Sequence, residues 1–306
     1  MAKASNRANI ISKVQAVLKK HYEPVVPTTR SVMENLLFAC CLEDGKYEQA
    51  DECFSRLQES YFDWNEVRVT TVRELGEVFK GIPNATANAL NLKNSLQSVF
   101  ESQYTFDLEH LKRQNLGQAV EFLASLKGTT QFSVAYVTQM NLGGHSIPLG
   151  KGGVDTFYIV GAVNEKEAAA GSVPGLERAI PKSKGVEFGS LLHQFSADLI
   201  STPFSANVRN ILLEIDPECK SRLPKRVDKK KLEAERRKQD EEAEAKKKAE
   251  KEAEEKQASK KKGVKKASAK STTASKTAKS AVKQVKKTTK SSNDTKKTAA
   301  TKKKAT

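Results

Sequence analysis

Apolar residues in the first 224 positions recur mostly every three or four residues, which is the spacing of one face of an α-helix. Ile10, Val14 and Leu18 show this spacing within residues 9–21, before Pro24 ends the run. The same spacing predicts further helices over residues 85–101, 187–200 and 206–213. We find no alternating strand pattern and no internal repeat. The pattern therefore predicts an all-α fold.

The stretch LGKGGVDTFYIVGAV, residues 149–163, places one carboxylate, Asp155, between a glycine-rich approach and an apolar run. An aspartate before an apolar run commonly starts a helix, because its side chain accepts hydrogen bonds from the first backbone N–H groups. We therefore expect a helix to begin at Asp155. The same carboxylate is a candidate for catalysis, and the two roles are compatible.

Charge is distributed unevenly along the chain. Residues 259–306 contain 17 lysines and one acidic residue, so the net charge of +16 of the whole chain resides there. This segment has too few large apolar side chains to bury a core, which predicts a disordered lysine-rich tail. Residues 225–258 mix both charge signs at helical spacing, which predicts a charged, solvated helix.

Two classes of protein are disfavoured. We find no secretory signal and no apolar run long enough to span a bilayer, so we expect no membrane association. The expected location is the cytoplasm and nucleoid, or the nucleus in a eukaryote. The cysteines show no paired zinc-binding spacing, which favours buried thiols and no metal site. They are Cys40, Cys41, Cys53 and Cys219.

The stretch LASLKGTTQFSVAYV, residues 123–137, predicts a helix, a short turn and a second helix. A glycine at such a bend can turn backbone N–H groups outward, where they bind a nucleic-acid phosphate. The candidate DNA-binding residues of this turn are therefore Lys127, Gly128, Thr129 and Thr130. The alternative is a plain interhelical turn without a ligand.

The hairpin LKGTTQFSVA followed about twenty residues later by VDT resembles the endonuclease III branch of the helix-hairpin-helix (HhH-GPD) DNA glycosylases. Upstream, NLLFACCLEDGKYEQA, DWNEVR and GIPNATANALNLKNSL stand where that family has its earlier helices, so the resemblance covers residues 31–223. It implies two helical lobes, one formed by residues 1–30 with 149–224 and the other by residues 31–148. It also implies a monomer that binds double-stranded DNA and takes a flipped-out base into a pocket.

The resemblance further implies roles for two residues. Asp155 stands at the position of the family's catalytic aspartate, in the VDT motif. Breaking an N-glycosidic bond builds positive charge on the sugar, and a carboxylate can stabilise that charge or activate the attacking water. Cys41 stands in place of a family glutamine and is expected to line the base pocket.

Three departures from the family change the expected activity. Phe132 occupies the position of the lysine that forms a Schiff base in members with lyase activity, so we expect no lyase step. Only Cys219 lies where the family has four cluster-binding cysteines, so we expect no iron–sulfur cluster. Phe157 and Val160 replace a histidine and an arginine, which predicts a more apolar surrounding for Asp155.

The leading hypothesis is a monofunctional DNA glycosylase of base-excision repair that hydrolyses the bond to a damaged or mispaired base. The tail would hold it on DNA by releasing counterions, with little sequence preference. The tail residues expected to bind DNA first are Lys260, Lys261, Lys262, Lys265 and Lys266. The tail has a second interpretation, in which it provides solubility or contacts RNA.

The alternative for the whole protein is a catalytically inactive, glycosylase-fold protein that binds DNA in an architectural role. Residues 1–224 hold 23 basic and 25 acidic residues, so the part expected to fold is close to neutral. A DNA-binding domain is usually more basic. Phe132, Phe157 and the missing cluster-binding cysteines favour the alternative.

Overall fold

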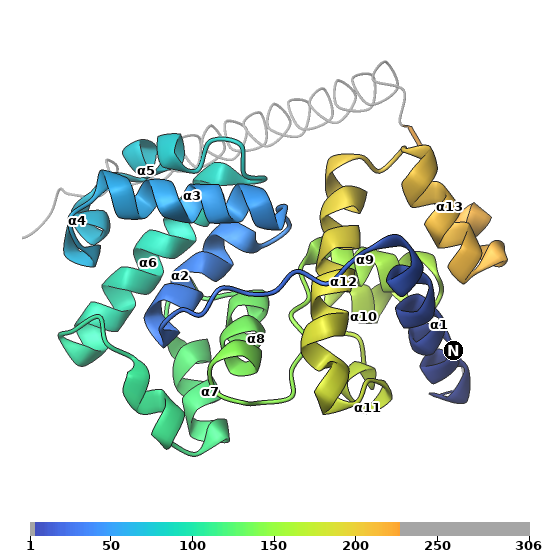
Figure 1. Cartoon of the computed structure of the whole chain (residues 1–306), viewed down its shortest axis with the longest axis horizontal. Coiled ribbons are helices and arrows are strands. Elements are labelled where there is room, and N and C mark those ends of the chain that lie inside the picture. Colours follow the sequence, from blue (N-terminus) through green and yellow to red (C-terminus); the bar gives the residue numbers. More distant parts are fainter. Residues whose placement is uncertain (1–3, 227–306) are drawn as a thin grey trace, which may run out of the picture. The chain divides into compact units, whose positions relative to one another are not determined.

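The computed structural model describes residues 4–226, which form α-helices and short 3-10 helices without a strand (Figure 1). The prediction of an all-α fold is confirmed for this part of the chain. The α-helices are α1 Ala4–His21, α2 Val32–Leu42, α3 Tyr47–Ser60, α4 Trp64–Val69, α5 Val72–Val78, α6 Ala85–Gln103, α7 Leu116–Ser125, α8 Gln131–Met140, α9 Lys151–Ile159, α10 Glu165–Ala169, α11 Leu176–Ala179, α12 Lys182–Ser201 and α13 Ala206–Ile215. The 3-10 helices are η1 Glu109–Arg113 and η2 Pro217–Ser221.

Two predicted segments lie outside the described residues. They are the charged helix expected up to residue 258 and the lysine-rich tail of residues 259–306. The tail residues expected to bind DNA lie there as well, namely Lys260, Lys261, Lys262, Lys265 and Lys266. Between residues 4 and 226 we find no helix with the length and apolarity that a membrane span requires.

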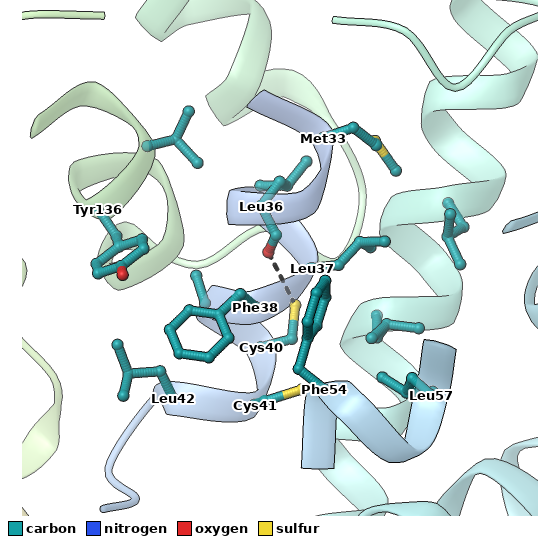
Figure 2. Packing of buried hydrophobic residues seen from close by; sticks show 14 of the residues in the cluster. Met33, Leu36, Leu37, Phe38, Cys40, Cys41, Leu42, Phe54, Leu57 and Tyr136 are labelled. Carbon is teal, nitrogen blue, oxygen red and sulfur yellow. Dashed lines mark hydrogen bonds between the residues drawn. The ribbon is translucent and has the colours of Figure 1, made fainter. Parts of the chain in front are cut away.

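A first hydrophobic core gathers around α2, which packs against α3, α6 and α8 (Figure 1). The sequence of α2 is apolar on nearly every side, as expected of a helix surrounded by others. Figure 2 shows Phe38 and Cys41 of α2 in this core, next to Phe54 of α3. The start of α2 is fixed by a capping box, in which the side chains of Ser31 and Glu34 each accept a hydrogen bond from the other's backbone N–H.

A second core joins α1 to helices α9, α11, α12 and α13 from the end of the described chain. Arg7 of α1 fixes this association through two contacts. Its Nε donates to the carbonyl oxygen of Ala162 over 2.8 Å, and its Nη2 donates to both carboxylate oxygens of Glu167 over 2.9 Å. Ile147, which precedes α9, already packs in this second core.

The turn after α2 connects the two cores. The Asp44 carboxylate accepts a hydrogen bond of 3.2 Å from the backbone N–H of Gly152, in the first turn of α9. His193 of α12 donates from Nε2 to the carbonyl oxygen of Gly45 over 2.8 Å. These bonds hold α9 and α12 beside the end of α2, which is the arrangement on which the candidate site depends.

Candidate functional site

Helices α7 and α8 form the predicted hairpin around residues 126–130. Thr130 caps α8, because its hydroxyl accepts from the N–H of Ser133 over 3.1 Å and its own N–H donates to the Ser133 hydroxyl over 2.8 Å. Gly128 has a φ of 91°, which favours glycine. A Cβ at Gly128 would also collide with the backbone of Asn91 in α6, so packing requires glycine here as well.

Most backbone N–H groups of this turn are already hydrogen-bonded within the protein. The N–H of Lys127 donates to the Ser98 hydroxyl over 3.1 Å, and that of Thr129 donates to a carbonyl of the turn over 3.5 Å. The N–H of Thr130 is bonded as described above. Within residues 4–226, only the Gly128 N–H of these four has no partner. The groups left to meet a phosphate are this N–H and the exposed side chain of Lys127.

Asp155 lies in the middle of α9, so the expectation that it starts the helix is wrong. The helix begins at Lys151 after Gly150, whose backbone is extended. The carboxylate of Asp44, in the turn after α2, caps the helix by accepting a hydrogen bond from the N–H of Gly152. Gly150 permits this approach, since a Cβ on it would lie 2.5 Å from Oδ1 of Asp44.

The Asp155 side chain faces a pocket of about 360 Å³. Its carboxylate forms an ion pair with Lys151, one helical turn earlier, and the side chain remains 37% exposed. The other walls come from the end of α2, the start of α8 and the segment around α10, and they include Glu43, Gln131, Phe132, Leu149, Ala168 and Gly171. The fold thus brings the VDT aspartate and the hairpin to one pocket.

Glu43 is a candidate site residue that the sequence analysis missed. Its Oε2 accepts a hydrogen bond of 2.9 Å from the hydroxyl of Thr130. Burial raises the pKa of Glu43 to about 7. The hydrogen bond from Thr130 lowers this pKa, and the negative charge of Asp44 raises it further. A carboxyl that titrates near neutrality in a pocket is typical of functional sites. The only signal in the sequence is an acidic pair at the end of an apolar helix.

Cys41 does not line this pocket, in contrast to the expectation from the resemblance. Its side chain is fully buried in the first core (Figure 2). Cys53 is its neighbour there, and burial raises the pKa of the Cys41 thiol well above the usual range. Residues two apart on a helix point in different directions. Glu43 therefore lines the pocket, whereas the side chain of Cys41 points into the first core.

Phe132, at the position of the family's lysine, is 1% exposed. Its ring stacks on Tyr136 with centroids 6.1 Å apart and lies 5.6 Å from the ring of His193. The hairpin therefore contributes an aromatic wall to the pocket and no amine. The burial of His193 lowers its pKa to about 4, so its ring is neutral at physiological pH.

Phe157 and Val160, which were expected to make the surrounding of Asp155 more apolar, do not line its pocket. Phe157 and Val160 are 0% and 1% exposed and belong to the second core, on the side of α9 that faces away from solvent. The charged neighbours of Asp155 are Lys151 and, through a weaker interaction, Asp44. Burial raises the pKa of Asp44, and the bond from Gly152 and the charge of Lys151 oppose this rise.

The cysteines do not fit the family's iron–sulfur cluster. Cys40, Cys41 and Cys53 are buried in the first core, whereas Cys219 is buried in the second with its Sγ 3.4 Å from the carbonyl oxygen of Leu212. A cluster needs four thiolates around one centre. Across residues 4–226 we find no group of three or more His, Cys, Asp or Glu residues that could hold a metal ion.

No protein-family model and no curated protein matches the chain. Among solved structures, it is similar to a thermostable thymine-DNA glycosylase, with 17% identity, a TM-score of 0.46 and coverage of 64% of this chain and 88% of that one. It is similar to endonuclease III in a non-covalent complex with DNA, with 13% identity, a TM-score of 0.48 and coverage of 71% and 99%. It is also similar to the H. pylori 3-methyladenine DNA glycosylase bound to 1,N6-ethenoadenine, with 14% identity, a TM-score of 0.43 and coverage of 63% and 95%.

Proposed function

We propose that this protein is a monofunctional DNA N-glycosylase of base-excision repair, which removes a damaged or mispaired base by hydrolysis. The observation that supports this most is that Asp155, Glu43 and Phe132 of the hairpin line one pocket of about 360 Å³. A pocket of this size, with Phe132 as an aromatic wall and carboxyl groups from Glu43 and Asp155, is suited to a flipped-out base.

Asp155 is the catalytic carboxylate in this proposal. As the N-glycosidic bond breaks, positive charge develops on the sugar, and a negative group fixed nearby lowers the energy of that state. Asp155 lines this pocket from α9, where its carboxylate pairs with Lys151 one turn earlier. Water then adds to C1′ of the sugar and completes the hydrolysis.

The absence of a lyase step is part of the proposal. A lyase needs a neutral amine that attacks C1′. Phe132 provides none, and the amine of Lys151 is engaged as an ammonium in the ion pair with Asp155. An ammonium has no lone pair with which to attack.

The remaining parts of the proposal concern partners. We infer a monomer that acts on double-stranded DNA in the nucleoid or nucleus, away from membranes and without an iron–sulfur cluster. The lysine-rich tail would supply most of the affinity for DNA, because the folded part is close to neutral. This attraction should fall steeply with salt concentration.

The proposal is tested by single-turnover excision on duplexes that carry a panel of damaged and mispaired bases. We expect Asp155→Asn to lower the excision rate by at least about 10²-fold, as for the loss of an electrostatic catalytic group. Glu165→Gln is the matched control, since Glu165 is an exposed carboxylate of α10 that does not line the pocket. No excision of any base by the wild type, or an unchanged rate in Asp155→Asn, would overturn the proposal.

A second candidate function is a non-enzymatic DNA-binding protein in which the fold serves as a scaffold. The hydrogen bonds that already occupy the turn N–H groups of Lys127, Thr129 and Thr130 favour it. Replacing the first tail lysines by glutamine in the full chain separates the two candidates. A scaffold then loses affinity equally for damaged and undamaged DNA, whereas a glycosylase keeps a preference for its lesion. The lysines to replace are Lys260, Lys261, Lys262, Lys265 and Lys266.

A further inference from the structure

Glu43 lies where the chain leaves α2 and the first core. Its Oε2 is held by the Thr130 hydroxyl over 2.9 Å, and Thr130 is itself held in place as the cap of α8 by the N–H of Ser133. In the described part of the chain, Oε1 of Glu43 has no hydrogen-bond partner. The carboxyl is thus fixed through one oxygen, and the other is free to hold or release a proton.

Few charged groups surround Glu43. Lys151 and Asp155 line the same pocket from α9, but they are paired with each other. Asp44 follows in the sequence, and its negative charge disfavours ionisation of Glu43, as burial does more strongly. Glu43 therefore exchanges its proton near neutral pH, where its pKa of about 7 lies.

Two other titratable groups near Glu43 stay uncharged at that pH. Burial raises the pKa of Cys40, one turn earlier on α2, to about 12. Burial lowers the pKa of His193, which donates to the carbonyl of Gly45, to about 4. Neither group changes its charge near neutrality, so the protonation of Glu43 is set by its own burial, by the opposing hydrogen bond from Thr130 and by the charge of Asp44.

We propose that Glu43 is a second catalytic residue, which donates a proton to the leaving base while Asp155 faces the sugar. This inference rests on the glycosylase function proposed above and names its substrate class. The substrate is an uncharged base, which leaves slowly unless it receives a proton. Two carboxyl groups with separate tasks in one pocket are a known arrangement for cleaving bonds at an anomeric carbon.

The step balances without another reactant. The bond between C1′ and the base nitrogen breaks, and its electron pair stays on the base. The proton of Glu43 passes to the base, which leaves as a neutral molecule, and the positive charge on the sugar faces Asp155. Water adds to C1′, and the proton that it loses returns to the carboxylate of Glu43. The net change is the exchange of a base for a hydroxyl group.

The charge of the base provides a sharp test of this assignment. An N7-alkylated purine already carries a positive charge, so it leaves as a neutral base without receiving a proton. Its excision should therefore not depend on Glu43. General acid catalysis contributes typically about 10² to 10⁴-fold in rate, so an uncharged base should lose about that factor when the donor is removed.

The experiment measures single-turnover excision by the full chain, for the wild type and Glu43→Gln, between pH 5.5 and 9. The duplexes carry an uncharged base (hypoxanthine, 1,N6-ethenoadenine or mispaired thymine) or the cationic 7-methylguanine. Glutamine keeps an oxygen that accepts from Thr130 but has no proton to transfer. Glu121→Gln is the matched control, since Glu121 is an exposed carboxylate on α7.

We expect the wild-type rate on the uncharged base to fall as the pH rises through about 7, where Glu43 loses its proton. In Glu43→Gln this dependence should disappear and the rate should drop by about 10² to 10⁴-fold. The rate at which Glu43→Gln excises 7-methylguanine should stay within about threefold of the wild-type rate, because this cationic base leaves without general acid catalysis. Glu121→Gln should match the wild type on every duplex.

Three results would overturn the assignment of Glu43 while leaving the glycosylase function in place. One is a wild type that excises only the cationic base, and another is Glu43→Gln with a wild-type rate and pH profile on the uncharged base. The third is an equal loss on both kinds of base, which indicates that Glu43 only supports the structure. A wild type that excises no base overturns the glycosylase function itself and this inference with it.

Discussion

The carboxylate of Asp44 accepts a hydrogen bond of 3.2 Å from the backbone N–H of Gly152, across 108 residues of sequence. This bond ties the end of α2, which carries Glu43, to the first turn of α9, which carries Asp155. A carboxylate is favoured at a helix N-terminus because the first N–H groups have no partner inside the helix. Asp44 therefore aligns the two elements whose carboxyl groups meet in the pocket.

Replacing Asp44 by alanine should lower the free energy of unfolding by about 1–2 kcal/mol, the usual effect of losing a helix cap. Asp44→Asn should cost less, because its amide oxygen still accepts from Gly152 and asparagine tolerates the φ of 59° at this position. Urea unfolding of both variants measures the difference. Equal stability of the two variants would show that the bond to Gly152 contributes nothing.

The excision rate should follow the same order in these variants, since Asp44 positions α9 without touching the base. We expect Asp44→Ala to lose activity and Asp44→Asn to keep most of it. The pH profile should keep its form in both, because Glu43 is still present, but its midpoint should move to lower pH, because the charge of Asp44 no longer raises the pKa of Glu43. A change in the shape of the profile would contradict a purely positioning role for Asp44.

The stability of the protein should report on the protonation of Glu43. The pKa of this carboxyl is raised from 4.5 to about 7 in the folded state, so the folded state binds the proton more tightly than the unfolded state does. The stabilising effect is therefore complete below pH 4.5 and is lost as the pH rises through about 7. Relative to wild type, Glu43→Gln should become more stable by about 1–2 kcal/mol from pH 5 to pH 8, a value reduced for partial solvent screening.

Urea unfolding of the wild type and Glu43→Gln at pH 5, 6, 7 and 8 measures this change. Glu121→Gln should show no such trend, because its carboxylate is exposed. Parallel stability curves for the wild type and Glu43→Gln would mean that the pKa of Glu43 is the same in the folded and unfolded states.

Local features of the fold could be predicted from the sequence because helix periodicity and helix caps depend on near neighbours. The helix expected over residues 85–101 corresponds to α6, Ala85–Gln103, and the helix expected over residues 187–200 lies within α12, Lys182–Ser201. The hairpin between α7 and α8 is also where the pattern places it. In each case the signals lie within a few residues of the element that they specify.

The site was harder to predict, because its contacts are distant in sequence. Asp155 has the local pattern of a helix cap, but Asp44 supplies the cap from 108 residues away, and the helix can then begin earlier. Glu43 becomes a candidate only through Thr130, its partner 87 residues later. The family pattern predicts Cys41 in the pocket, but a position in a pattern does not give the direction of the side chain, which here points into the core. The direction of a side chain depends on packing, which one sequence does not reveal.

Arg222 should stabilise the end of α9. Its Nε donates to the carbonyl oxygen of Ile159 over 2.7 Å, and its Nη2 donates to Asp216 over 3.0 Å. The guanidinium also lies against Gly161, where a Cβ would be 2.8 Å from Nη2. Arg222→Ala should lower the free energy of unfolding by about 2–3 kcal/mol, since charged hydrogen bonds are lost and a backbone carbonyl is left unpaired.

Arg222→Lys is the informative control. Lysine keeps the charge but cannot bond Ile159 and Asp216 in the planar geometry of a guanidinium. It should therefore recover less than half of the loss in urea unfolding. Full recovery by lysine would mean that only the charge of this residue matters.

Gly128 should be the least replaceable residue of the hairpin. Its φ of 91° disfavours any side chain, and its Cβ would collide with the backbone of Asn91 in α6. Gly81 has a similar φ of 96°, but a Cβ there meets nothing within 4 Å, so it serves as a matched control. Gly81→Ala should cost about 1 kcal/mol through backbone strain alone, and Gly128→Ala about 3 kcal/mol or more through strain and overpacking.

The difference between these two variants, measured by urea unfolding, isolates the contact between the hairpin turn and α6. It also decides how the turn can meet DNA. A large difference means that α6 holds the turn rigidly, so that of the four turn N–H groups only that of Gly128 is free to meet a phosphate. Equal costs would mean that the turn separates easily from α6, which would release the N–H of Lys127 from Ser98 and make it available to a phosphate.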